Sequence, residues 1–338
     1  MEMILESNNR IIMTSRMNFF IGVLLAGVLL FFILQSVDME ALRNTFAVVS
    51  WPLFALSAGF YALNSFVRAV RFRYALYGKL SASALLSVVF ILSFLNSVLP
   101  TRTGELSYIY LVRKLKHDSV PENVASLVIS RLYDIICASL FVLGSIAFIS
   151  PMFMNGEKLI IVLGVLCAVS VVISCALLFK SDWVRKFFHA VFSWDFFKKF
   201  QWFQVMGSGI LDIENSISRM SGSSFSIPLF LFAILSWFLN FIHLWLLLLS
   251  IHLPLSFWAA VFIFALPGII AFLPLQPLFG IGTFEASLSV GFLVLGFSPE
   301  MALQSSIVLH AGLFAITGFF AILGFYSYLL YNTHRQSF

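Results

Sequence analysis

Long apolar runs recur along almost the whole chain, and they constrain its fold more than any other feature. Of the 338 residues, 61% are hydrophobic and only 10% are charged, and the mean hydropathy is +1.01. Soluble globular domains carry about 45–50% apolar and about 25% charged residues. The sequence therefore predicts an all-α polytopic membrane protein. The polar segments between the runs are too short to form a separate soluble catalytic domain.

Six of the apolar runs are long enough to be predicted as full membrane spans, which need about 18 or more residues. They are Met17–Leu34, Phe46–Val67, Val124–Ile149, Leu159–Phe179, Ser226–Ser250 and Met301–Tyr331. The first is too long for a signal-peptide core and is followed by no A-x-A site, so we expect it to remain as a span. Cys137, Cys167 and Cys175 lie in apolar runs and indicate neither a disulfide framework nor a metal site.

Two further apolar runs are interrupted by proline and glycine. The run 83–112 contains NSVLPTRTGE, and the run 257–296 contains LPLQPLFGIGTFE. Proline removes a backbone donor and glycine permits left-handed backbone, so a helix is expected to break at each place. The expected tip residues are Asn96, Pro100 and Gly104 in the first run and Pro277, Gly280 and Gly282 in the second. Each break ends in a carboxylate, Glu105 or Glu285.

Charge distribution predicts how these runs cross the membrane. Basic gaps flank the run 83–112 on both sides, and such gaps favour the cytoplasmic face. A single span cannot begin and end on one side, so we expect a re-entrant hairpin there, and a second one at 257–296 that enters from outside. Both termini are then cytoplasmic, and Arg43 and Lys158 are the only basic residues placed outside.

The order of these elements predicts an inverted repeat within a single membrane domain, residues 1–338. Residues 17–149 and 159–331 each contain span, span, hairpin and span, in opposite orientations. Repeats of this kind point to a transport site near the bilayer midplane, so we expect Glu105 and Glu285 to approach one water-filled centre. The basic, phenylalanine-rich segment 180–224 is expected to lie at the cytoplasmic interface against anionic lipid headgroups. A solvated linker is the alternative.

Ionisable side chains inside the apolar runs are functional candidates, because each costs roughly 2.5–3.5 kcal/mol to insert. The deep ones are Arg102, Glu105, Arg131, Asp134, His243, Glu285 and His310. Glu105 is expected to open a half-helix at its positive end, where a loop can also bind phosphate. Arg102 either pairs with Glu105 or holds such a phosphate. A simple helix cap is the alternative for Glu105.

The remaining candidates leave several interpretations open. Glu285 has no nearby cation in sequence, so it either pairs with a distant basic group, stays protonated, or caps its helix. Arg131 and Asp134 are three apart and can pair on one helix face, and Arg131 can also turn towards Glu105. His243 and His310 are expected to form interhelical hydrogen bonds rather than carry protons. We expect Arg68, Arg71 and Arg73, at the cytoplasmic end of a span, to anchor headgroups, and capture of a headgroup is the alternative.

Three stretches of the sequence resemble the transmembrane family of lysylphosphatidylglycerol synthase. They read NSVLPTRTGELSYIYLVRK, SRLYDII and PLFGIGTFEASLSVGFLVLG, and the resemblance extends over nearly the whole chain. It implies an inverted-repeat lipid translocase with two re-entrant hairpins. The matching positions are Pro100, Arg102, Gly104, Glu105, Arg131, Asp134, Gly280, Gly282 and Glu285.

The chain also departs from this family pattern. Ser130 stands where an acid often precedes Arg131, Leu278–Phe279 replaces paired glycines, and His310 stands where relatives carry arginine. The aminoacyltransferase domain of bifunctional relatives has no counterpart in this sequence, so the chain itself is not expected to charge lipids with amino acids.

These observations together predict a flippase of the cytoplasmic membrane for a modified phospholipid or a polyprenyl-phosphate-linked lipid. The expected substrate-binding residues are Arg102, Glu105, Arg131, Asp134 and Glu285. No HExxH, GxSxG, GxGxxG or P-loop pattern occurs, so we expect no enzyme activity, no cofactor, no metal and no nucleic-acid partner. Assembly as a homo-oligomer is left open. The alternatives are an ion-coupled transporter of a small solute, a membrane enzyme acting on lipid headgroups, or a purely structural partner protein.

Overall fold

The part of the chain that the structure describes is built from helices. The computed structural model describes Glu40, Arg43 and residues 47–99, 104–116, 120–149, 157–179, 223–270 and 277–336. Its elements are α3 (Trp51–Ala75), α4 (Ala82–Val98), α5 (Glu105–Lys116), α6 (Val120–Ile149), α7 (Glu157–Phe179), α11 (Ser223–Ser250), α12 (Phe257–Ile270), the short 3-10 turn η3 (Leu278–Gly280), α13 (Thr283–Val294) and α14 (Pro299–Gln336).

Five of these helices, α3, α6, α7, α11 and α14, are long and apolar enough to cross a membrane. This protein is therefore a multi-pass membrane protein, as its sequence predicts. The first predicted span, Met17–Leu34, lies outside the described residues. The same is true of the predicted interfacial segment 180–224, apart from the first residues of α11.

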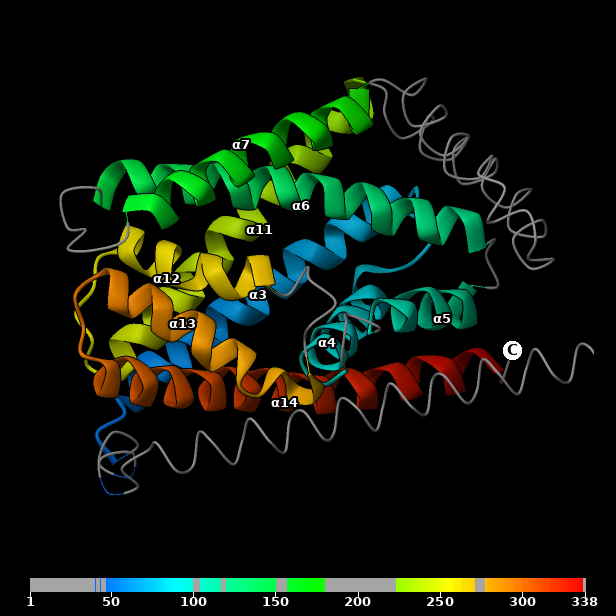
Figure 1. Cartoon of the computed structure of the whole chain (residues 1–338). Helices are drawn as coiled ribbons and strands as arrows, with labels where there is room; N and C mark the ends of the chain where they lie inside the picture. Colours follow the sequence, from blue (N-terminus) through cyan, green and yellow to red (C-terminus); the bar gives the residue numbers. More distant parts are fainter. Residues whose placement is uncertain are drawn as a thin grey trace, which may run out of the picture.

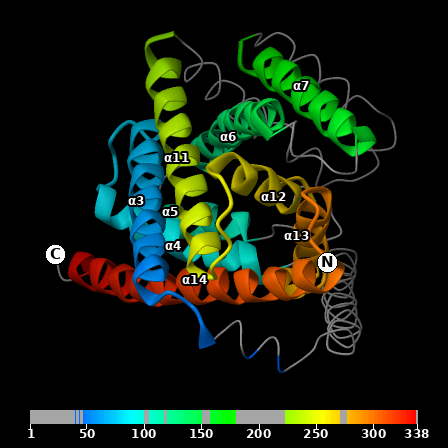
Figure 2. The same cartoon turned by 90° about the vertical axis from the view of Figure 1, so that its left-hand side faces the viewer.

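The helices α3 and α11 form a central pair, and α14 crosses this pair near one end (Figure 2). Polar groups join the two helices along their length. The hydroxyl of Ser57 lies 2.7 Å from His243 Nδ1, and the amide of Asn64 donates to Asn240 at 3.3 Å. Ser57, Asn64 and Arg71 are spaced by seven residues, about two helical turns, so they occupy one face of α3. This face carries polar side chains into the middle of the bundle.

Helix α3 is longer than the sequence predicts. The expected span ends at Val67, whereas the helix continues to Ala75 because Arg68 and Arg71 find polar partners inside the bundle. The helix then ends in a Schellman motif, in which Gly78 N–H donates to Arg73 O at 2.8 Å and Tyr77 is left-handed with φ 54°.

The two interrupted runs form two pairs of shorter helices, and the members of each pair pack together. Helices α4 and α5 lie on one side of the molecule and α12 and α13 on the other (Figure 1). Between α12 and α13 the backbone turns through η3, where Phe279, Gly280 and Gly282 all have positive φ. The helix breaks therefore fall where proline and glycine predict them.

The two pairs of short helices have equivalent neighbours when the helices are matched in chain order, α3 with α11, α4 with α12 and α6 with α14. Helix α4 packs against α3 and α14, while α12 packs against α11 and α6. In addition, the η3 turn of the second pair contacts α4 of the first. Each pair of short helices is thus held between the central helices and one long outer helix.

Candidate functional site

A buried ion pair between α3 and α6 forms the base of the candidate site. Arg71 Nη1 donates to Asp134 Oδ1 at 2.7 Å, and Arg71 Nη2 donates to Asp134 Oδ2 at 3.1 Å. The indole of Trp237 on α11 also donates to Asp134 Oδ1, at 3.2 Å. The Arg71 side chain is only 1% exposed. Because removing two charges from water is costly, such a pair persists only with this two-pronged geometry and further hydrogen bonds.

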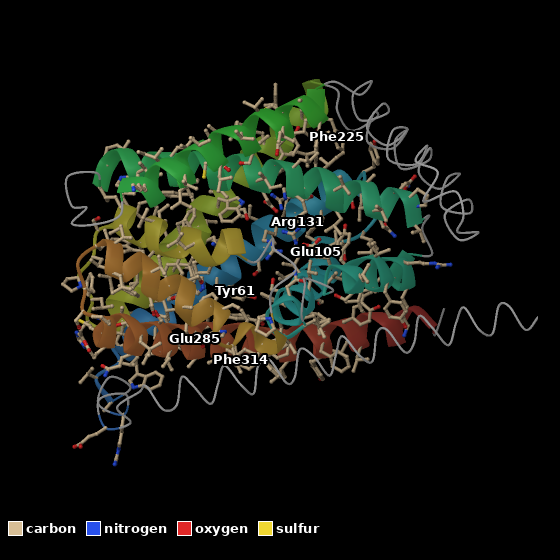
Figure 3. The ribbon with its side chains drawn as sticks, viewed as in Figure 1. Tyr61, Glu105, Arg131, Phe225, Glu285 and Phe314 are labelled. Carbon is tan, nitrogen blue, oxygen red and sulfur yellow. The ribbon has the colours of Figure 1, made fainter. Side chains whose placement is uncertain are left out.

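Arg131 connects this pair to the start of α5. Its Nε lies 2.8 Å from Glu105 Oε1, and its Nη1 donates to Asp134 Oδ2 at 3.2 Å. Figure 3 shows Glu105 and Arg131 next to one another in the middle of the molecule. Both predicted contacts of Arg131, with Asp134 on its own helix and with Glu105, are present. The side chains of Glu105 and Arg131 are 23% and 22% exposed, so this outer pair is more accessible than the Arg71–Asp134 pair.

Helix α4 completes the arrangement. Arg68, one turn before Arg71 on α3, donates from Nη1 to Ser93 Oγ at 2.9 Å. Asn96 lies three residues after Ser93 on the same face of α4. A Cβ placed on Gly104 would lie 2.5 Å from Asn96 Oδ1 and 2.7 Å from Asn96 N, so only glycine permits the chain entering α5 to approach α4 this closely.

These side chains form what we call the arginine cluster: Arg68, Arg71, Ser93, Asn96, Glu105, Arg131 and Asp134. Among the described residues, the cluster holds three guanidinium groups and two carboxylates, which gives these residues a formal excess of one positive charge. Arg71 Nε and Asn96 Oδ1 are buried and have no hydrogen-bond partner among the described residues. The cluster thus has both charge and hydrogen-bonding capacity that its own members do not use.

A second polar centre lies at the start of α13. Glu285 Oε2 accepts a hydrogen bond from Gly282 N–H at 2.7 Å, and Glu285 Oε1 lies 2.7 Å from His310 Nδ1 on α14. Gly282 has φ 86°, a left-handed conformation that glycine adopts readily. Glu285 is therefore both a helix cap and the partner of a distant basic side chain. The predicted interhelical role of His310 is confirmed, and His243 likewise joins α11 to α3.

The comparison with protein families fits this geometry. The family model described as the lysylphosphatidylglycerol synthase TM region matches residues 19–323. The chain belongs to this family. Neither the curated proteins nor the solved structures contain a match. The three resembling stretches all lie within the matched range, and they supply Asn96, Glu105, Arg131, Asp134 and Glu285 to the two centres.

In this member of the lysylphosphatidylglycerol synthase TM family, the two carboxylates that follow the helix breaks have separate partners. Glu105 pairs with Arg131 and Glu285 with His310. Figure 3 shows Glu285 apart from the Glu105–Arg131 pair. The prediction that Glu105 and Glu285 approach one shared centre is therefore wrong, because each carboxylate belongs to its own polar centre.

Aromatic side chains, instead of charges, lie where the second tip meets the first pair of helices. The ring of Phe314 on α14 lies 5.9 Å from that of Phe279 in η3 and 5.3 Å from that of Phe94 on α4. The tip of one helix pair and the first helix of the other therefore share an aromatic neighbour.

One sequence interpretation is wrong and needs a physical explanation. Arg68 and Arg71 were expected to anchor headgroups at the membrane surface, but Arg71 is buried and both belong to the arginine cluster. The error arose because the apolar run ends at Val67, whereas the helix does not. The seven-residue spacing of Ser57, Asn64 and Arg71 is the signal that could have placed Arg71 on the inner face.

Most of the predicted tip residues lie at the two helix breaks. Gly104, Pro277, Gly280 and Gly282 lie at the two breaks, while Pro100 and Arg102 lie outside the described residues. Within the described ranges, no group of three or more His, Cys, Asp or Glu side chains is arranged to hold a metal ion.

Proposed function

We propose that this protein is a lipid translocase, a flippase of the cytoplasmic membrane that moves a modified phospholipid or a polyprenyl-phosphate-linked lipid. The observation that supports it most directly is the arginine cluster, a group of ionised side chains with excess positive charge held among apolar helices. Ionisable groups inside a membrane are costly and mark the paths of polar substrates. The family match supports a role connected with membrane lipids.

In the proposed topology, the α4–α5 and α12–α13 pairs are re-entrant hairpins, and six full spans surround them. The matching contacts of α4 with α3 and α14, and of α12 with α11 and α6, are those expected of an inverted repeat. Both termini are on the cytoplasmic side. Irregular backbone at each hairpin tip is then buried in protein or lines the route of the headgroup, as a membrane interior requires.

The mechanism that we propose is an exchange of ionic partners. A phosphate entering the cluster replaces Glu105 on Arg131, because this outer pair is partly exposed while Arg71 and Asp134 are buried beneath it. The released Glu105 carboxylate then binds an amine or hydroxyl group of the same headgroup. The acyl or prenyl tails remain in the bilayer throughout. No covalent bond forms or breaks, so the substrate leaves chemically unchanged.

Reconstitution into liposomes tests this proposal. The protein is incorporated with fluorescent phospholipids, and translocation is followed by the loss of fluorescence when a membrane-impermeant reductant is added. We expect Glu105→Gln and Arg131→Gln each to slow translocation at least tenfold relative to the unmodified protein. Lys79→Gln is the matched control, because Lys79 forms an ion pair with Glu122 at 2.7 Å on the exposed surface.

If the Glu105→Gln and Arg131→Gln variants translocate lipid as fast as the unmodified protein, these residues do not belong to the substrate site. Mass spectrometry of the lipids recovered after the assay addresses the enzyme alternative. Unchanged lipid masses support translocation. A new lipid species would instead support the alternative of a membrane enzyme that acts on lipid headgroups.

A further inference from the structure

Arg68 differs from the other two arginines of the cluster in its partners. Arg71 and Arg131 are each bound to one or more carboxylates. Among the residues that the structure describes, the Arg68 guanidinium bonds only to the neutral hydroxyl of Ser93. Arg68 therefore carries the positive charge that the carboxylates of the cluster do not neutralise.

The surroundings of Arg68 make this charge costly to hold. Arg68 is partly buried and lies one turn before Arg71 on α3, and the carboxylate of Asp134 already binds both Arg71 and Arg131. Because Asp134 is shared by Arg71 and Arg131, it offsets little of the positive charge of Arg68. A partly buried excess charge is stabilised when an anion enters to offset it.

The cluster also has donors that can serve such an anion. Arginine carries five N–H donors in a planar fork, and Arg68 uses one of them on Ser93. Arg71 Nε is fully buried in the cluster and has no acceptor among the described residues. Planar forks from two arginines suit the oxygens of a phosphate, which accepts several such bonds at once.

We propose that Arg68 and Arg131 together bind a phosphodiester, with Arg68 as its principal contact. The single negative charge of a phosphodiester equals the formal excess positive charge of the cluster. This inference rests on the proposed function for the location of the site and for its phosphate ligand. It adds Arg68, a residue outside the resembling stretches, as the main contact of that phosphate. The phosphate comes either from a lipid headgroup or from a free phosphate ester.

Binding of lipids to the purified full-length protein tests this inference without any need for transport. Native mass spectrometry measures retention of phosphatidylglycerol and of a galactosyl diacylglycerol, which has similar tails and no phosphate. We expect the unmodified protein to retain phosphatidylglycerol preferentially. Arg68→Gln should weaken phosphatidylglycerol binding at least tenfold, and Arg68→Lys should weaken it less because the charge remains. Arg73→Gln is the matched control, since Arg73 is an exposed arginine on the same helix.

A competition arm distinguishes the two sources of phosphate. Displacement of phosphatidylglycerol by glycerophosphoglycerol, a phosphodiester without tails, at millimolar concentration identifies the phosphodiester group itself as the ligand. Displacement only by a second phospholipid identifies a lipid headgroup held partly by its tails. Equal retention of both lipids by the unmodified protein, or unaltered phosphatidylglycerol binding by Arg68→Gln, would overturn the inference.

Two further measurements keep the test decisive. If Arg68→Gln does not fold, the thermal unfolding of the unmodified protein is compared in the two lipids, and equal unfolding temperatures would count against a phosphate site. If Arg68→Gln binds phosphatidylglycerol normally while Glu105→Gln abolishes translocation, the phosphodiester assignment fails and the proposed function stands. If the unmodified protein binds phosphatidylglycerol preferentially but translocates no lipid, the phosphodiester assignment stands and the proposed function fails.

Discussion

The carboxylate of Asp134 accepts hydrogen bonds from Arg71, Arg131 and Trp237, which lie on three different helices. At the scale of single residues, it is therefore the group on which the geometry of the arginine cluster depends. Removing one partner of a buried ion pair leaves the other charge uncompensated, which costs more than the pair itself contributes.

We expect Asp134→Asn to lower the free energy of unfolding by about 3–5 kcal/mol, because Arg71 would keep its charge in a site that is 1% exposed. Thermal or denaturant unfolding in detergent measures this loss. The exposed Lys79–Glu122 pair provides the comparison, and Lys79→Gln should change stability by about 0–1 kcal/mol. Similar losses in the two variants would show that the cluster does not stabilise the fold.

Some of these residue contacts could be predicted from the sequence and others could not. The Arg131–Asp134 contact follows from a spacing of three on one helix. The stronger Arg71–Asp134 pair joins residues 63 positions apart, and no local pattern specifies such a contact. The same holds for Glu285, whose partner His310 lies 25 positions away on another helix.

At the scale of elements, the break between α4 and α5 depends on one close backbone approach. A methyl group at Gly104 would meet backbone atoms of Leu95 and Asn96 at 2.7 Å, and these atoms cannot rotate away as a side chain can. The start of α5, and with it the Glu105 carboxylate, is therefore positioned by the absence of a side chain.

We expect Gly104→Ala to displace the start of α5 and to reduce translocation at least tenfold, because Glu105 would no longer meet Arg131. The liposome assay measures the rate, and gel filtration checks that the protein remains folded. Gly59→Ala is the matched control, since a Cβ at Gly59 would have no neighbour within 4 Å. Equal rates for the two variants would show that the position of α5 does not matter.

Proline and glycine predict that the helices break at these places, because both residues act locally on the backbone. The end of α3 was predicted less well. A hydropathy profile ends a predicted span at the first arginines. In the structure, Arg68 and Arg71 remain inside the bundle because they have polar partners on α4 and α6.

At the scale of the whole molecule, the multi-pass helical architecture follows directly from the apolar runs. How the described helices pack together does not, since it depends on contacts such as α4 with α14 that join distant segments. The orientation of the bundle in the membrane is a separate prediction that rests on charge.

Cysteine labelling tests this orientation. In a variant whose three native cysteines are replaced by alanine, we expect Lys158→Cys to react with a membrane-impermeant maleimide in intact cells. Lys79→Cys should react only after the membrane is permeabilised, because the basic gap around it is expected in the cytoplasm. The reverse labelling pattern would invert the topology.

The contact between η3 and α4 has a mechanical consequence. Helix α4 carries Ser93 and Asn96 of the arginine cluster, and η3 immediately precedes the Gly282–Glu285 cap, so the two centres are joined by a short, stiff path through Phe94, Phe314 and Phe279. We therefore expect a tilt of α4 that uncovers one centre to shift the other, so that the two sides of the protein move together.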